Sequence, residues 1–282
     1  MHDDNLSNWN PNVLNSSPLF KPLRALQPFM DQHQQAWPRL EDYQKLLRQN
    51  VPKLRSDFGS PLKFVAQGGK PVAIEDQYEA RIYLKGEIQT RLKNWHDFFQ
   101  VLVWCTFPKT KVSLNYLHYT ESQTRAKDKT INCNRGPLEN TIALFDECGS
   151  IIVSCEEELL NLIRNFKWKK LFIEHSKMLD KHLRCFVFGH AMYDKALNPY
   201  IGMTSPAVLL LVEPDYFLAP LSTQLEIADQ RVAELFNSKT AITSPKDLQP
   251  FPLLGMPGWY NGHQTEAFYS NTRYFRMSRG QK

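Results

Sequence analysis

The sequence lacks an apolar run long enough to cross a membrane. The longest such stretch, around residues 98–107, is interrupted by Gln100 and Thr106. It falls short of the roughly 18 apolar residues that a spanning helix requires. Residues 1–5 have neither the basic start nor the apolar segment of a secretory signal. We therefore expect a cytoplasmic protein that does not associate with membranes.

Cysteine is also scarce. The count is odd, no Cys-x-x-Cys pair occurs, and no histidine-rich spacing accompanies the five residues, which are Cys105, Cys133, Cys148, Cys155 and Cys185. This pattern indicates neither a disulfide framework nor a zinc knuckle. We expect these residues to be reduced thiols, which agrees with a cytoplasmic location.

A large charge excess is missing as well. The net charge is +5, from 34 basic and 29 acidic residues, and the basic residues are scattered in small groups. Nucleic-acid-binding proteins usually concentrate such residues in a stripe or patch. We therefore expect no specific nucleic-acid partner, whereas the residues are compatible with a small-molecule substrate. The sequence does not determine the oligomeric state.

Several sequence motifs of known chemistry are absent too. The chain contains no Gly-x-x-x-x-Gly-Lys-Ser/Thr, Gly-x-Ser-x-Gly, His-Glu-x-x-His or Gly-x-Gly-x-x-Gly motif. These motifs mark P-loop proteins, α/β-hydrolases, zincin proteases and dinucleotide-binding folds, respectively. Nothing in the sequence supports any of those four classes.

Composition and patterning indicate a globular protein of mixed secondary structure. Of 282 residues, 42% are apolar and 22% are charged, close to ordinary globular usage. Without internal repeats or low-complexity linkers, we predict a flexible segment over residues 1–18 and one globular domain over residues 19–282. The expected fold is α+β, with short sheets covered by six or more helices and an aromatic-rich C-terminal tail wrapped on the surface.

The apolar periodicity predicts the elements of this fold. Helical spacing occurs at residues 19–30, 40–47, 94–105, 109–125, 190–197 and 221–235, and a further helix begins near residue 154. Short apolar runs predict strands at residues 62–65, 81–84, 141–145, 150–153, 185–188 and 207–212. The runs 141–145 and 150–153 are expected to form a β-hairpin around the sequence Asp-Glu-Cys-Gly.

One predicted helix carries a row of polar residues. Lys111, Asn115, His118 and Ser122 are spaced four, three and four residues apart, so they share one face of the helix. An imidazole beside an amide and an ammonium could supply acid–base chemistry and hold an anion. The alternative is a solvated helix face.

Histidines stand at two other predicted helix starts. Asn94 is expected to cap the helix in which His96 and Asp97 occupy the first turn, where Asp97 suits the free N–H groups. The same position disfavours a cationic His96, so its neutral imidazole could act as a ligand or a base. His190 follows a strand and a glycine, with Asp194 one turn later, and forms either a site or an exposed pair.

Asp146 and Glu147 fall in the expected hairpin turn. Adjacent carboxylates on extended chain point to opposite faces, so they make a poor acid–base pair. Ordinary turn chemistry explains both residues equally well.

Four ordered motifs between residues 90 and 276 resemble those of a bacterial family of uncharacterised proteins, catalogued as the domain of unknown function DUF3025. The first contains Trp95-His96-Asp97-Phe98-Phe99 with Lys111, Asn115 and His118, and the second contains Arg135-Gly136-Pro137 with Asp146-Glu147. The third contains Phe188-Gly189-His190-Ala191 with Lys195, and the fourth contains Pro257-Gly258-Trp259 with Ala267-Phe268-Tyr269. The resemblance implies kinship and brings no established activity.

The leading functional hypothesis is an enzyme with a polar pocket, a hydrolase or transferase acting on a small or phosphate-bearing substrate. Its candidate catalytic residues are His96, Asn115, His118, His190 and Asp146, with Asp97 and Asp194 as further orienting groups. Two histidines with one or two carboxylates would suit zinc, manganese or iron, although no spacing requires a metal. The alternative is a non-catalytic binding or assembly protein that uses an aromatic, mildly basic surface.

Overall fold

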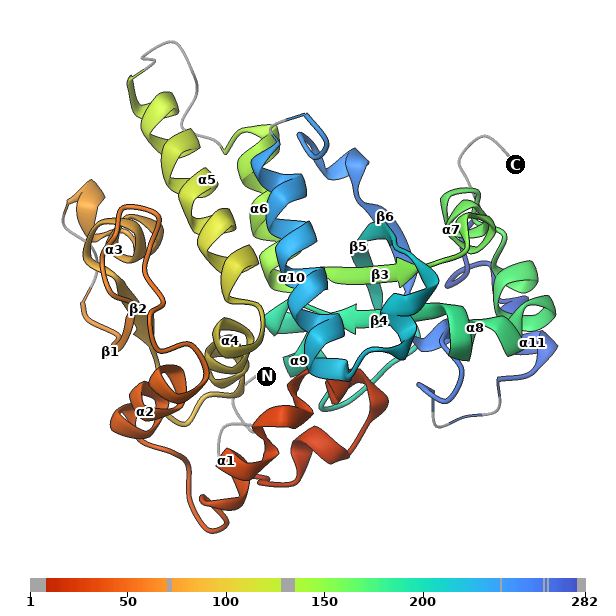
Figure 1. Ribbon diagram of the computed structural model, residues 1–282, viewed down its shortest axis with the longest axis horizontal. Helices are drawn as coiled ribbons and strands as arrows, with labels where there is room; N and C mark the ends of the chain where they lie inside the picture. Colours follow the sequence, from red (N-terminus) through yellow and green to blue (C-terminus); the bar gives the residue numbers. More distant parts are fainter. Residues whose placement is uncertain are drawn as a thin grey trace.

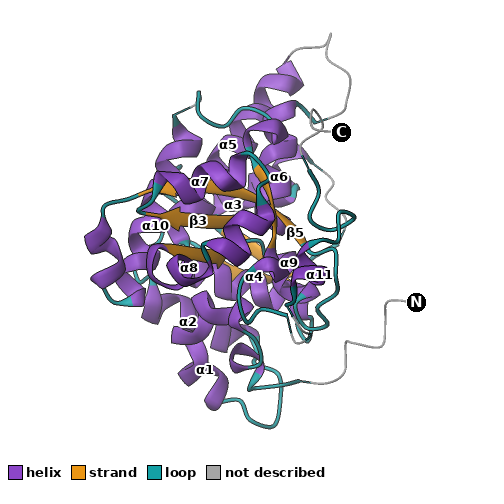
Figure 2. Cartoon of the chain, turned by 90° about the vertical axis from the view of Figure 1, so that its right-hand side faces the viewer, coloured by secondary structure: helices purple, strands orange, loops and turns teal. Residues whose placement is uncertain are grey.

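The computed structural model of the chain describes residues 9–69, 73–127, 135–238, 240–260, 262 and 264–277. A four-stranded sheet in the order β4–β3–β5–β6 lies at its centre with helices around it (Figures 1 and 2). The strands are β3 (Ser150–Ser154), β4 (Leu183–Val187), β5 (Thr204–Leu211) and β6 (Gln249–Pro252). β3 pairs with β4 antiparallel and with β5 parallel, and β6 pairs with β5 antiparallel.

The central strand β3 is buried along its whole length, which accounts for its continuous run of Ile and Val between two serines. A second, smaller sheet pairs β1 (Lys63–Ala66) with β2 (Glu87–Thr90) in parallel. It lies at the left of Figure 1, where α3 (Tyr78–Lys85) connects its two strands.

The remaining helices cover these sheets. They are α1 (Gln27–Asp31), α2 (Leu40–Asn50), α4 (Trp95–Thr106), α5 (Pro108–Lys127), α6 (Pro137–Cys148), α7 (Glu157–Arg164), α8 (Ser176–His182), α9 (His190–Lys195), α10 (Leu221–Asn237) and α11 (Glu266–Tyr269). The α+β prediction, with short sheets and six or more helices, is confirmed. None of the helices within the described residues combines the length and apolarity needed to cross a bilayer.

Two different caps fix the long helices next to the sheet. The Asn94 side chain accepts a 3.0 Å hydrogen bond from the Asp97 amide, as predicted for the start of α4. The start of α5 is capped from α10, because the Asp229 carboxylate accepts from the amides of Lys109 and Thr110 at 2.9 and 2.8 Å. This cap lies about 120 residues away in sequence, so no local pattern could have predicted it.

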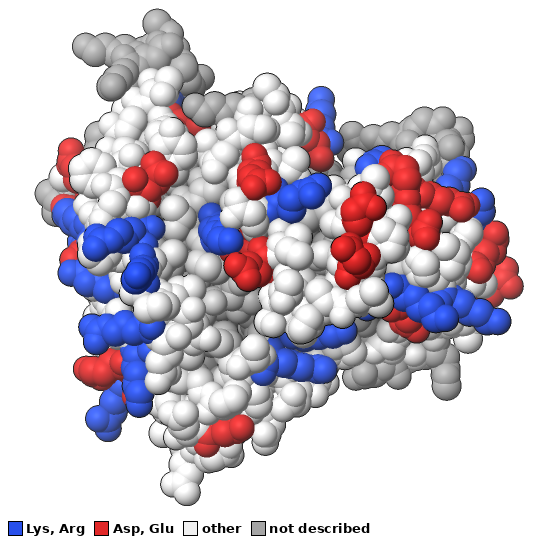
Figure 3. Space-filling model, in the orientation of Figure 1, with Lys and Arg blue, Asp and Glu red and all other residues white. Residues whose placement is uncertain are grey.

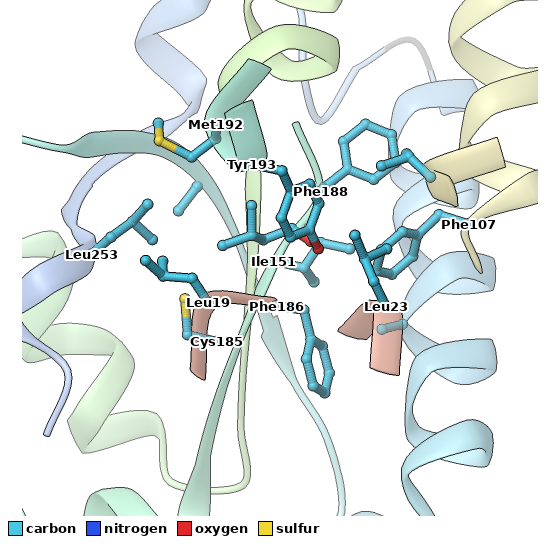
Figure 4. Packing of buried hydrophobic residues seen from close by; sticks show 14 of the residues in the cluster. Leu19, Leu23, Phe107, Ile151, Cys185, Phe186, Phe188, Met192, Tyr193 and Leu253 are labelled. Carbon is cyan, nitrogen blue, oxygen red and sulfur yellow. The ribbon is translucent and has the colours of Figure 1, made fainter. Parts of the chain in front are cut away.

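Aromatic rings join the sheet to the helices. Phe188, directly after β4, stacks on Phe145 of α6 with ring centroids 4.9 Å apart and meets Phe107 edge-on at 5.5 Å. Figure 4 shows this region, where Ile151 of β3 and Leu23 of the 3-10 helix η3 (Pro18–Leu26) complete the packing. The end of β4 is therefore held firmly against α6.

Part of the N-terminal segment joins this core. Val13 and Leu14 are buried, and the Trp9 ring stacks on Trp95 at a centroid distance of 5.3 Å. Residues 9–18 thus pack against the domain, although they fall within the segment expected to be flexible. Residues 1–8 and Cys133 lie outside the described residues. The other four cysteines are free thiols.

Two strand predictions are wrong. Residues 81–84 belong to α3, which ends at Gly86 in the left-handed conformation. Residues 141–145 belong to α6, so the predicted hairpin does not form and Asp146 lies on the last turn of a helix. Pro137 at the first helical position and the Glu139 carboxylate, which accepts from the Gly136 amide, start this helix.

The C-terminal tail is anchored through its rings. Tyr269, Tyr274 and Phe275 are buried. The Tyr274 hydroxyl donates to the Met203 carbonyl at 2.9 Å and accepts from the Leu254 amide at the same distance. The prediction of an aromatic-rich tail wrapped on the domain is confirmed.

Glu139 links the start of α6 to α5 through its buried carboxylate, which pairs with Arg125 at 2.8 Å. Burial acts to raise the pKa of Glu139, but the Arg125 and Gly136 hydrogen bonds outweigh it and the pKa lies below its ordinary value. Glu139→Gln should therefore lower the free energy of unfolding at pH 7 by about 1.5–3 kcal/mol. The loss should shrink as the pH falls below about 4, because protonation removes the same interaction from the parent.

Thermal melts of both proteins from pH 3 to 7 measure this difference. Glu213→Gln, at an exposed position, serves as the control and should leave the melting temperature unchanged at every pH. A Glu139→Gln deficit that stays constant down to pH 3 would show that charge is not its cause.

Candidate functional site

A cavity of about 670 Å³ opens between α4, α5, α6, the start of α9 and the smaller sheet. This volume is typical of sites for small molecules. All five candidate catalytic residues line it, namely His96, Asn115, His118, Asp146 and His190. Residues that are distant in sequence are therefore brought together, whereas Ser122 and Asp194, which were considered with them, are not among the lining residues.

The pairing of β3 with β4 positions two of these segments. Ser150 lies opposite Val187 in this antiparallel ladder. Glu147 is three residues before Ser150 and His190 is three residues after Val187, so the pairing brings Glu147 near His190. The Gly149 carbonyl accepts hydrogen bonds from the amides of Phe188 and Gly189, both at 2.9 Å. The end of α6 and the start of α9 are thereby fixed relative to each other.

Gly189 is required at this junction because the two backbones approach closely. A Cβ atom at this position would lie 2.4 Å from the Glu147 carbonyl oxygen and 2.4 Å from the Cys148 nitrogen. Both contacts are with backbone, which cannot rotate away as a side chain could.

His96, Glu147 and His190 form a cluster at this junction. The Nε2 atoms of the two histidines lie 3.1 Å apart, and the Nε2 atom of His190 lies 3.6 Å from Glu147 Oε2. One donor atom from each residue lies within 4.8 Å of the others. Two ligands that are each about 2.1 Å from one ion, at angles of 90–110°, are about 3.0–3.4 Å apart. The cluster therefore has dimensions close to those of a three-ligand divalent metal site.

The other nitrogen of His190 faces an ion pair. Its Nδ1 atom lies 3.7 Å from Asp146 Oδ2, while the Lys111 ammonium lies 2.5 Å from Asp146 Oδ1. Burial acts to raise the pKa of Asp146, but the Lys111 charge outweighs it and the pKa lies below its ordinary value. Burial lowers the pKa of His190 to about 3, against the opposing effect of Asp146. His190 is thus neutral at pH 7, with a carboxylate behind its ring.

This ion pair changes the role expected for Lys111. The lysine side chain is 5% exposed and is engaged by Asp146, so it is not free to hold an anion by itself. Its contribution is to keep Asp146 ionised beside His190. A carboxylate behind a histidine is the usual second layer of a metal site, where it orients the ring.

Asn115 and Asp97 hold the walls of the cavity. The Asn115 amide donates to the Glu79 carbonyl oxygen at 3.0 Å and to its carboxylate at 2.6 Å, which ties α5 to α3. Asp97 accepts from the Arg91 amide at 2.6 Å and from its guanidinium at 2.7 Å. These contacts hold both side chains in the cavity wall.

Three buried nitrogen atoms of lining residues have no hydrogen-bond partner within the described part of the chain. They are Nδ1 of His118, Nδ1 of His190 and Nε1 of Trp104. A buried polar atom without a partner costs about 1–3 kcal/mol. Because these atoms have almost no solvent-accessible area, they lie within the cavity wall and not on its open surface.

Glu147 is a residue of the cavity that the sequence did not predict. On a strand it would have pointed away from Asp146, but neighbouring residues on a helix are only about 100° apart. Both carboxylates therefore reach the cavity from the last turn of α6. The signal that could have identified it is the Gly-Pro-x-Glu helix start at residues 136–139.

Mutation can distinguish the contribution of His118 to stability from that of a core residue. Its ring faces the cavity, whereas the adjacent Leu117 is 1% exposed and belongs to the hydrophobic core. His118→Ala should melt within a few degrees of the parent, whereas Leu117→Ala should lose about 2–5 kcal/mol of stability. Thermal melts of the three proteins test this, and equal losses would place His118 among the structural core residues.

Gly189→Ala should destabilise the fold by about 1–3 kcal/mol, because the new methyl group must push α6 away from α9. Gly69→Ala is the matched control, since a Cβ there would meet nothing within 4 Å. Differential scanning calorimetry of both variants measures the effect. A Gly189→Ala protein as stable as the Gly69→Ala protein would mean that this junction is loosely packed.

Comparison with known proteins identifies a family and no individual relative. Neither the search of curated proteins nor the search of solved structures gave a match. A family described as "Protein of unknown function (DUF3025)" matches residues 62–279, which include every residue of the cavity cluster. With more than half of its length matched, the chain belongs to the DUF3025 family.

Proposed function

We propose that this protein is a metal-dependent enzyme, a hydrolase or transferase that acts on a small polar molecule. The observation that carries the proposal is the cluster of His96, Glu147 and His190, which converges in a cavity of about 670 Å³. Two nitrogen donors and one oxygen donor suit zinc, iron or manganese.

The cluster has the composition of a catalytic metal site. Three protein ligands leave at least one coordination position for water or substrate, whereas structural zinc sites are usually closed by four protein ligands. An ion bound there would lower the pKa of a coordinated water and polarise a substrate oxygen. The Asp146 carboxylate, paired with Lys111, supports this role, because it lies 3.7 Å from Nδ1 of His190, the ring nitrogen that does not face the cluster.

The cavity lining supports a small polar substrate. The side chains of His118, Trp104 and Tyr78 line the cavity, and imidazole, indole and phenol groups can form hydrogen bonds with the oxygen atoms of a polar ligand. His118, whose Nδ1 atom has no hydrogen-bond partner among the described residues, is the proposed acid or base.

The surface supports the same choice of ligand. On the face shown in Figure 3, acidic and basic side chains are interspersed over most of the surface, and basic side chains gather along its left edge, over the smaller sheet and the helices beside it. The small net charge of +5 favours a small molecule over a nucleic acid as the ligand. We also propose a cytoplasmic location, which the four free thiols support.

The alternative of a binding or assembly protein depended on an aromatic surface. In the structure, Tyr269, Tyr274 and Phe275 of the C-terminal tail are buried, whereas Trp259, Tyr260 and Phe268 are partly buried, which favours an anchoring role for the tail over an exposed aromatic surface. The cavity cluster therefore remains the strongest functional feature.

Glu147→Gln tests the proposal because it keeps the shape of the side chain and removes the anionic ligand. We expect it to lower the Zn²⁺, Mn²⁺ or Fe²⁺ retained by the purified protein by about one equivalent per chain. Elemental analysis by inductively coupled plasma mass spectrometry measures this loss. Turnover of small ester and phosphate-ester substrates by the metal-loaded parent should disappear in the same variant.

Glu157→Gln, at an exposed position on α7, is the control and should keep both metal and turnover. His96→Ala and His190→Ala should behave like Glu147→Gln. If these three variants retain the parent's metal content and its turnover, the cavity cluster is neither a metal site nor the source of activity.

A further inference from the structure

A second group of potential ligands lies at the opposite end of the β3–β4 pair. The last pair in the ladder is Ser154 with Leu183, and the same register continued by one residue places Cys155 opposite His182. The Cys155 amide donates to the His182 carbonyl at 3.3 Å, which confirms that the pairing extends to this point.

Ser154 fixes the backbone around these residues. Its buried hydroxyl donates to the His182 carbonyl at 2.8 Å and accepts from the Glu156 amide at 3.0 Å. The start of α7 and the end of α8 are thereby held together. The backbone that carries the side chains of Cys155, Glu156 and His182 is therefore rigid.

The donor atoms of these side chains converge on one point. His182 Nδ1 lies 3.5 Å from Cys155 Sγ and 2.9 Å from Glu156 Oε1. One donor from each residue lies within 4.8 Å of the others. In a nucleophile–base–acid relay the cysteine and the carboxylate would face opposite nitrogens of the imidazole. Here Cys155 Sγ and Glu156 Oε1 both face Nδ1 of His182. This arrangement disfavours a relay and is the one expected of three ligands around a metal ion.

We propose that Cys155, Glu156 and His182 bind a second divalent cation of the zinc class. Ligands at about 2.3 Å for sulfur and 2.1 Å for nitrogen, in tetrahedral geometry, lie about 3.5–3.6 Å apart, and the observed separation of Sγ and Nδ1 is 3.5 Å. A thiolate and a carboxylate together balance the charge of the ion. Binding releases the thiol proton of Cys155 to solvent.

The surroundings allow an ion to enter. The side chains of His182 and Glu156 are 36% and 39% exposed, so the fourth coordination position faces water. The nearby Arg184 guanidinium is engaged by the carbonyls of Asp180 and Leu183 and lies over the Phe217 ring. The ion would connect the start of α7 to the end of α8.

This site is independent of the cavity cluster. Five-residue strands separate the two groups of ligands by roughly 17 Å, so no ligand is shared. The sulfur ligand gives the second site a spectroscopic signature that the cavity cluster, which has nitrogen and oxygen donors only, does not have.

Cobalt(II) titration of the reduced full-length protein tests the proposal, since Co²⁺ replaces Zn²⁺ in such sites. We expect a sulfur-to-cobalt charge-transfer band in the near ultraviolet, which zinc abolishes. The band should be absent from Cys155→Ser and strongly reduced in His182→Ala and Glu156→Gln. Cys148→Ser, which removes the free thiol next to Glu147, is the matched control and should keep the band.

Glu147→Gln separates this inference from the proposed function. The band should persist in that variant while total cobalt falls, because only the cavity cluster is lost. Zinc should also raise the melting temperature of Glu147→Gln, but not that of the double variant with Cys155→Ser. A parent without the charge-transfer band, or a band that survives in Cys155→Ser, overturns the proposal.

Discussion

The backbone hydrogen bonds between β3 and β4 determine which residues meet at both ends of this strand pair. Because the register is fixed from Ser150–Val187 to Ser154–Leu183, Glu147 lies near His190 at one end and Cys155 opposite His182 at the other. A shift of one residue would turn the alternating side chains of β3 to the wrong faces. Burial of the whole strand makes such a shift costly, so the hydrophobic core maintains both clusters of polar ligands.

The sequence predicted elements well where one local pattern dominated. The apolar spacing in residues 94–125 and 221–235 indicated α4, α5 and α10, and these helices form close to the expected bounds. Prediction failed where local signals conflicted. Thr141 and Ile142 favour extended chain through their branched side chains, but the Pro137 and Glu139 start signal and the Arg125 pair stabilise a helix. The Arg125 contact comes from another element, so the local sequence does not contain it.

The candidate site was easier to predict than its chemistry. Polar residues inside otherwise apolar segments, such as His118 and His190, were expected to share a cavity, and all five nominated residues line one. The roles of Lys111, Asn115 and Asp97 could not be predicted, because their partners lie on other elements. Lys111 was expected to be available to an anion, yet it is paired with Asp146. Glu147 was set aside because the wrong secondary structure placed it on the wrong face.

The Lys111–Asp146 pair shows why stability alone does not explain this cavity. Both side chains are largely removed from water, and the cost of removing two charges from water can exceed their mutual attraction. Apolar residues of similar size would often stabilise a fold equally well. The pair instead places a fixed negative charge behind His190. The ring has Asp146 on the side of Nδ1, and its Nε2 atom lies 3.1 Å from His96 Nε2 and 3.6 Å from Glu147 Oε2.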